Sequence, residues 1–94
     1  MPTTKKDLVH AVSRKTGLTQ VDCTIILEEF MESISRALIN GRRIEIRGFA
    51  RFKLITQQPR IARNPKTGVS VQIPARIRPK FYASRDLIRK VSGL

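Results

Sequence analysis

The sequence has 94 residues, with 19 Lys and Arg against seven Asp and Glu, and its formal net charge is +12. A chain of this length fits one small domain, which would bury only about 60–65% of its unfolded surface and be marginally stable as an isolated monomer. The excess of positive charge predicts a polyanionic partner, either nucleic acid or an anionic membrane. The single cysteine, Cys23, excludes an intramolecular disulfide, and no apolar run has the length of a membrane span or a secretory signal. We therefore expect a cytoplasmic protein.

The positive charge is confined to one part of the chain. Residues 1–41 carry five basic and five acidic side chains, whereas residues 42–94 carry 14 basic side chains and only Glu45 and Asp86 as acids. A run of charge often marks no more than a solvated surface, but an excess confined to half of a small domain indicates a binding surface. The sequence therefore predicts a neutral scaffold followed by a basic, polyanion-binding part.

The neutral part begins with a predicted short helix. Thr4 and Asp7 have the spacing of a capping box, in which each side chain accepts a hydrogen bond from the other residue's backbone N–H. Leu8, Val9 and Val12 then share one face of the helix. Gly17 follows at the position where a glycine can end a helix in the left-handed conformation.

A longer helix is predicted to start after Thr19, where Asp22 repeats the capping signal, and to end near Asn40 and Gly41. At about 100° per residue its apolar side chains fall in an arc roughly 140° wide. A face this broad needs a partner, and we expect its large side chains, Phe30 and Met31 among them, to be core residues. The arc is formed by Cys23, Ile26, Leu27, Phe30, Met31, Ile34, Ala37 and Leu38.

After Gly41 the hydrophobic period changes from that of a helix to that of strands. Charged and apolar residues alternate over residues 43–47, which predicts a strand. Residues 49–54 follow as a second strand after Gly48. The alternation is clearest in residues 69–81, which would form a strand with one apolar core face and one basic face.

Two prolines and a final helix complete the elements expected in the basic part. Pro74 and Pro79 are expected to break the ladder of the last strand and to place it at a sheet edge or a bend. A short helix is predicted to begin near Ser84, with Leu87, Ile88 and Val91 as its apolar residues.

The segment between the long strands, residues 57–68, contains the residue types of a hairpin tip. Asn64 favours the start of a turn, Pro65 fixes its own φ, and Gly68 permits a positive φ at the exit. Flanking strands of about six residues would project roughly 20 Å. Such a ribbon is not rigid by itself in water, so its cations would find partners on phosphates or in a groove. Pro65 offers an apolar ring without a donor, which suits insertion between base pairs.

No motif of catalysis accompanies these features. The sequence has no paired carboxylates, glycine-rich phosphate loop or nucleophile motif, so we expect no enzyme activity, cofactor or small-molecule substrate. His10 lies opposite the apolar face of the first helix and has no partner at metal-ligand spacing, which predicts an exposed side chain and no metal site. Cys23 lies on the apolar arc and is interpreted as a small buried residue.

Three features together resemble the bacterial HU and integration host factor family over nearly the whole chain. They are Gly48-Phe49, the run of residues 60–68, and the helix–helix–strand order; residues 43–49 are closer to the beta subunit of integration host factor than to HU. The resemblance implies an α+β fold with an N-terminal helix pair, a three-stranded antiparallel sheet with a long β-ribbon arm, and a short C-terminal helix. It also implies an intertwined dimer.

In these terms, residues 1–94 form a single domain. Residues 1–41 are its helical dimerisation part, and residues 42–94 form the sheet, the arm at about 57–73 and the last helix. An identical partner subunit is expected, and a different one is left open.

The resemblance also assigns DNA-binding residues. Pro65 would intercalate from the minor groove and kink the duplex, while Arg47 would reach into the minor groove with Glu45 orienting it. The chain has Ala50 and Ala62 where the family usually has glycine, and the second change would reduce the flexibility of the arm. The full set of implied DNA contacts is Arg47, Arg60, Arg63, Asn64, Pro65, Lys66, Arg76, Arg78, Lys80 and Arg85.

The function predicted from these observations is architectural binding and bending of double-stranded DNA in the nucleoid. One alternative is a sequence-preferring subunit of the integration host factor type that acts in recombination or transcription. A second is an RNA-binding basic protein, although the few aromatic residues and the unsuitable groove of A-form RNA disfavour it. A membrane-surface protein is disfavoured because the polar face of the long helix is acidic.

Overall fold

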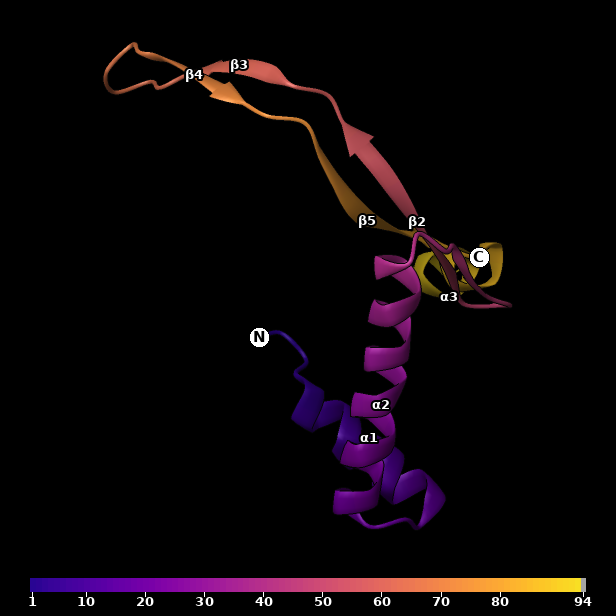
Figure 1. The fold of residues 1–94 in the computed structure, drawn as a ribbon. Coiled ribbons are helices and arrows are strands. Elements are labelled where there is room, and N and C mark those ends of the chain that lie inside the picture. Colours follow the sequence, from indigo (N-terminus) through magenta and orange to yellow (C-terminus); the bar gives the residue numbers. More distant parts are fainter. Residues whose placement is uncertain (94) are drawn as a thin grey trace. The chain divides into compact units, whose positions relative to one another are not determined.

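A computed structural model describes residues 1–93 of the chain. Its contacts divide the chain into two compact units, Met1–Arg36 and Ala37–Leu94. The single domain over residues 1–94 stays a prediction. The elements confirm the α+β class and the predicted order, and they can be followed in Figure 1. They are α1 (Lys5–Thr16), α2 (Gln20–Ile39), β1 (Ile44–Ile46), β2 (Ala50–Gln57), β3 (Arg60–Arg63), β4 (Ser70–Ile73), β5 (Arg76–Ala83) and α3 (Arg85–Ser92).

Helix α1 begins with the predicted capping box. The Asp7 N–H donates to the Thr4 hydroxyl at 3.3 Å, and the Thr4 N–H donates to the Asp7 carboxylate at 3.0 Å. The helix ends at Gly17, whose φ of 79° places it in the left-handed region and whose N–H donates to the Ser13 carbonyl at 2.9 Å. Each of these bonds satisfies a backbone group that the helix itself leaves unpaired.

Helix α2 starts and stops where the sequence predicted. The Thr19 hydroxyl accepts from the Asp22 N–H at 3.1 Å, and Gly41 follows the helix with a φ of 76°. The Arg42 N–H then donates to the Ala37 carbonyl at 2.9 Å, which satisfies one of the last carbonyls of the helix.

The apolar face of α2 is covered only in part. Cys23 is buried, as predicted, together with Val9 of α1. The prediction of Phe30 and Met31 as core residues is wrong for a single chain, because their exposed fractions are 52% and 42%. The 12 residues of α1 are too few to cover one side of the 20-residue α2.

Strands β1, β2 and β5 form an antiparallel sheet in that order, which confirms the predicted three-stranded sheet. Strand β1 is connected to β2 by a tight turn, in which Gly48 has a φ of 80° and the Phe49 N–H donates to the Ile46 carbonyl at 3.0 Å. Ala50, at the start of β2, is 1% exposed and leaves no room for a bulky side chain. The short turn thus fixes the register of the first two strands.

The last predicted strand is divided in two, because Pro74 and Ala75 separate β4 from β5. The expected break at Pro79 is wrong: Pro79 lies inside β5 and pairs with Leu54 of β2. Strand β5 is an edge strand of its sheet, as predicted, and edge strands tolerate proline because part of their N–H groups have no ladder partner. Helix α3 follows at once, with the Ser84 hydroxyl accepting from the Leu87 N–H at 3.1 Å.

The apolar positions of the late strands do not form a buried face in this chain. Ile77 is 68% exposed and Phe81 is 48% exposed. The alternation of apolar residues is therefore present as predicted, but these side chains are not buried in this chain. Phe81 contacts Phe52 and Phe49 edge to face, at centroid distances of 5.6 and 6.1 Å. This aromatic cluster is a half-covered surface on one side of the sheet.

Candidate nucleic-acid interface

One face of the three-stranded sheet is strongly basic. Alternate residues of a strand share a face, and the antiparallel register of β2 and β5 aligns the cationic positions of both strands on the same side. Lys53 lies directly opposite Lys80, and Arg78 and Arg76 continue the row toward the arm. We call this surface the basic sheet face; its cationic residues are Arg51, Lys53, Arg76, Arg78 and Lys80.

Only part of this face was predicted from the sequence. Arg76, Arg78 and Lys80 were predicted, whereas Arg51 and Lys53 of β2 were missed. The missed residues alternate with Phe52 and Leu54, so a period-2 signal was present. Which side of the sheet they share with β5 depends on the register between strands that lie far apart in the sequence.

The opposite face of the same sheet is apolar. The register places Ala50, Phe52 and Leu54 of β2 beside Phe81 and its neighbours on β5. The sheet therefore has two sides of different chemistry, and each side favours a different kind of partner.

Tyr82 is the one aromatic residue on the basic sheet face. Its ring lies within 5.7 Å of the Lys53 ammonium nitrogen and within 5.5 Å of the Lys80 ammonium nitrogen. Each such cation–π contact contributes about 0.5–1 kcal/mol at an exposed site. The contacts partly offset the repulsion between two lysines that lie directly opposite each other on neighbouring strands.

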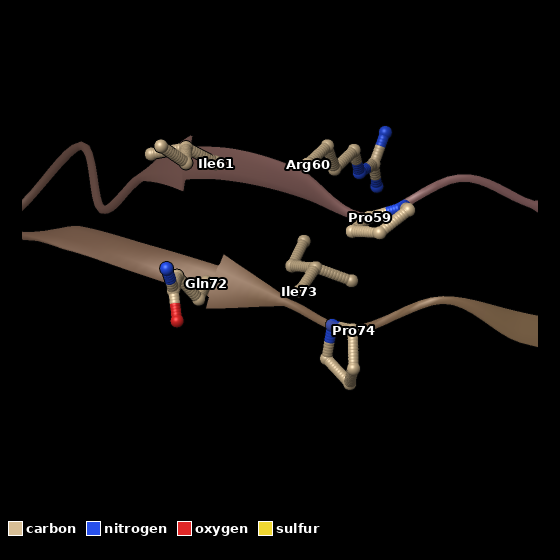
Figure 2. A pocket seen from close by; sticks show the side chains of 6 residues that line it. All are labelled: Pro59, Arg60, Ile61, Gln72, Ile73 and Pro74. Atoms are coloured by element: carbon tan, nitrogen blue, oxygen red, sulfur yellow. The ribbon is translucent and has the colours of Figure 1, made fainter.

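The arm is the two-stranded ribbon of β3 and β4, in which Arg60 pairs with Ile73 and Arg63 pairs with Ser70. Its strands have four residues each, fewer than the six expected, because the ladder is interrupted at Pro59 on one side and Pro74 on the other. Figure 2 shows these two prolines at the same end of the ribbon. Both line a hollow of about 340 Å³. The ribbon is therefore separated from the body sheet by an unpaired step on both strands.

The tip of the arm has the predicted turn chemistry. The Asn64 side chain accepts from the Lys66 N–H at 2.9 Å, and the Asn64 carbonyl accepts from the Gly68 N–H at 2.8 Å. Gly68 has a φ of 72°, and the Asn64 N–H closes the hairpin on the Val69 carbonyl at 2.9 Å. These bonds leave Pro65 exposed at the end of the ribbon.

Arg47 and Glu45 lie away from the tip, around a hollow of about 300 Å³ between the sheet and the start of α3. Arg51 and Arg85 line the same hollow, so three arginines and one glutamate are among its lining residues. Glu45 lies directly opposite Arg51 on the neighbouring strand. Within residues 1–93, Glu45 forms no ion pair with Arg47, so any orienting effect of the carboxylate is not a direct contact in this chain.

Within residues 1–93, no ion pair neutralises the cations of this interface. In the described part of the sequence the ion pairs are Lys5–Glu28 at 3.7 Å, Arg36–Glu29 at 2.8 Å and Arg89–Asp86 at 4.0 Å. None of them includes a cation of the arm or of the basic sheet face. These cations are therefore free to bind an external anion.

Other kinds of site find no support in the described residues. Residues 1–93 hold no group of three His, Cys, Asp or Glu side chains that could bind a metal ion. His10 is exposed, and its Nδ1 lies 3.5 Å from the Gln20 amide nitrogen. No helix in this range has the length and apolar content needed to cross a membrane.

Comparison with known proteins agrees with the geometry. A family model described as bacterial DNA-binding protein matches residues 3–92. The chain is 38% identical to integration host factor subunit beta of Thioalkalivibrio sulfidiphilus, over 97% of this chain and 96% of that protein. It is 40% identical to the subunit of the same name from Marinobacter nauticus, over 95% and 92% of the two chains.

Two solved structures extend this likeness to the fold. Anabaena HU in a cocrystal with DNA has a TM-score of 0.90 and 32% identity, over 97% of this chain and 99% of that one. HU from Thermotoga maritima has a TM-score of 0.66 and 27% identity, over 94% and 97%.

Proposed function

We propose that this chain, which belongs to the bacterial DNA-binding protein family of HU and integration host factor, bends duplex DNA with its arm and its basic sheet face. It is an architectural DNA-binding protein, and its family is not one of enzymes. The observation that carries the finer proposal is the row of unneutralised cations on one side of the sheet. We place its site of action in the nucleoid.

Phosphate contacts from the basic sheet face would supply most of the affinity. Each cation that neutralises a phosphate releases a condensed counterion, so the logarithm of the binding constant falls by about 0.9 per contact for each tenfold rise in salt. Arg85 lies at the start of α3, beside the same sheet, and extends this surface. Affinity of this kind carries little sequence information.

The arm would supply the bend. Arg60, Arg63 and Lys66 are exposed along the ribbon and would follow the minor groove, while Asn64 holds the turn that presents Pro65. Insertion of an apolar wedge between base steps is a mechanism known for this family, and it is carried over here to Pro65. Unstacking a step costs a few kcal/mol, which is offset by the additional protein surface that bent DNA contacts.

Arg47 is the residue on which any sequence preference would depend. Minor-groove base edges differ little between A·T and T·A, so an arginine there reads groove width and A·T content. Its position beside Glu45 and Arg51 supports the alternative of an integration-host-factor-like subunit. An Arg47→Ala variant would then reduce the ratio of affinities for preferred and unrelated duplexes, with equal ratios in both proteins contradicting this role.

A dimer is the assembly that the uncovered apolar surfaces favour. Phe30 and Met31 of α2 and Phe81 of β5 are about half exposed, although they are large apolar residues. Their burial against a second subunit would contribute about 25 cal/mol per Å² of apolar surface. An identical subunit or a related one could provide this cover.

Competition between nucleic acids tests the proposed partner. The complete chain is titrated onto a labelled duplex of about 30 base pairs at several salt concentrations, with unlabelled duplex DNA or duplex RNA of the same sequence as competitor. We expect affinity to fall steeply with salt and DNA to compete much better than RNA. Affinity that does not change with salt, or equal competition by RNA, would contradict the proposal.

A further inference from the structure

We propose that Tyr82 is a positioning residue for DNA binding, whose ring holds the ammonium groups of Lys53 and Lys80 together for contact with DNA phosphates. The inference rests on the proposed function, because the phosphodiester backbone of duplex DNA is its ligand. It adds Tyr82, an uncharged residue, to the cationic residues of the basic sheet face.

The geometry of the three side chains supports this role. Lys53 and Lys80 lie directly opposite each other on β2 and β5, and Tyr82 lies two residues further along β5 on the same face. Tyr82 is therefore the diagonal neighbour of Lys53, at a spacing that aromatic and long side chains can bridge. Both ammonium nitrogens lie within 6 Å of the ring centroid, at 5.7 and 5.5 Å, inside the range of a cation–π contact.

The charge of the cluster points to an external anion. Two lysines opposite each other repel, and within residues 1–93 no carboxylate forms an ion pair with either. The acid of this sheet, Glu45 of β1, lies opposite Arg51 and lines a hollow with Arg51 and Lys53, but it forms no ion pair with this lysine within residues 1–93. A phosphate placed over the cluster would supply the missing negative charge to both lysines at once.

The aromatic ring would also lower the entropic cost of binding. A lysine has a long side chain with many rotamers, and ordering it on a phosphate loses that freedom. Tyr82 and Lys53 are half-buried, so the ring and the stem of this lysine are already restricted in the free protein. Preorganised groups bind more tightly because less freedom remains to be lost.

Variants of the complete chain test the inference on a labelled duplex of about 30 base pairs. Tyr82→Leu keeps apolar bulk but removes the ring face, and we expect duplex affinity to fall about fivefold or more. Tyr82→Phe keeps the ring and should bind within about twofold of the natural chain. Lys53→Gln should lower the slope of affinity against salt by about 0.9 in the natural chain and by less in the Tyr82→Leu background.

A measurement on the free protein complements the variants in case Tyr82→Leu is poorly folded. The ring should shift the ε-methylene proton resonances of Lys53 and Lys80 upfield, in the natural chain and in Tyr82→Phe alike. Ordinary lysine shifts in both proteins would overturn the inference.

The binding outcomes separate this inference from the proposed function. If the natural chain binds duplex DNA with a steep salt dependence and folded Tyr82→Leu does the same, only the role of Tyr82 is overturned. Tyr82→Phe binding as weakly as Tyr82→Leu would overturn it too, because the ring would then not be the agent. If the natural chain does not bind duplex DNA, both proposals fail.

Discussion

The helical part, residues 1–41, and the basic part, residues 42–94, use their polar groups in opposite ways. In the helices the charges neutralise one another, as in the pairs Lys5–Glu28 and Arg36–Glu29, and large apolar side chains remain uncovered. In the basic part, 14 cations share two acids, and within residues 42–93 one ion pair at 4.0 Å joins Arg89 to Asp86. An exposed apolar face favours a protein partner, and a cationic face favours a polyanion. The two parts therefore differ in the partner each needs.

The largest effect is expected where a charge is placed on the uncovered face of α2. Phe30 and Ile25 are exposed to a similar degree in the single chain, at 52% and 60%, but lie on opposite sides of the helix. If a second subunit covers Phe30, then Phe30→Asp should cost about 3–5 kcal/mol from lost packing alone. Sedimentation equilibrium should show dissociation of the dimer in this variant.

Ile25→Asp is the matched control for this substitution. It introduces the same charge into the same helix and should leave the dimer intact, because its side chain lies outside the apolar arc. Equal behaviour of the two variants would show that no second subunit covers the Phe30 side of α2. The helical part would then not need a protein partner.

A smaller effect is expected from removal of one cation in the basic part. Arg78→Gln should lower the slope of affinity against salt by about 0.9, because one phosphate contact and its counterion are lost. Arg14→Gln removes the same charge from the helical part and should leave the slope unchanged. Fluorescence titration at four or five salt concentrations measures both slopes, and equal decreases would mean that total charge, and not its placement, determines binding.

The smallest effect concerns the electrostatics of α1, which act within the helix. The backbone N–H of Thr4, and then its hydroxyl, lower the pKa of Asp7 below its ordinary value of 3.8. Because the folded pKa is lower than the unfolded one, the stabilisation is complete above about pH 3.8 and is lost as the pH falls through the folded value. Titration of the Asp7 carboxyl carbon by NMR should give a midpoint below 3.8, and a midpoint at or above it would contradict the capping box.

The local features of both parts could be predicted from the sequence. The cap at Thr4, the helix start near Ser84 and the turn at Asn64 depend on residues within four positions of one another, and the structure confirms them. Residue type and spacing are sufficient for such features, because the hydrogen bonds join near neighbours in the chain.

The features that depend on distant residues could not be predicted in the same way. Arg51 and Lys53 were missed because the side of the sheet that they share with β5 follows from a strand register, which the sequence does not contain. The exposure of Phe30 was predicted wrongly because periodicity identifies an apolar face but not what covers it. The roles of Pro65 and Arg47 stay predictions, because they concern contacts with DNA.

The most direct test of the account is the end-to-end distance of a short duplex measured by fluorescence energy transfer at matched saturation. The natural chain should shorten this distance, and Pro65→Ala should shorten it much less, because the apolar wedge that kinks the duplex is lost. Pro59→Ala, at the base of the same arm, is the control and should bend DNA like the natural chain. If Pro65→Ala bends the duplex as strongly as the natural chain, then Pro65 is a turn residue and the wedge account is wrong.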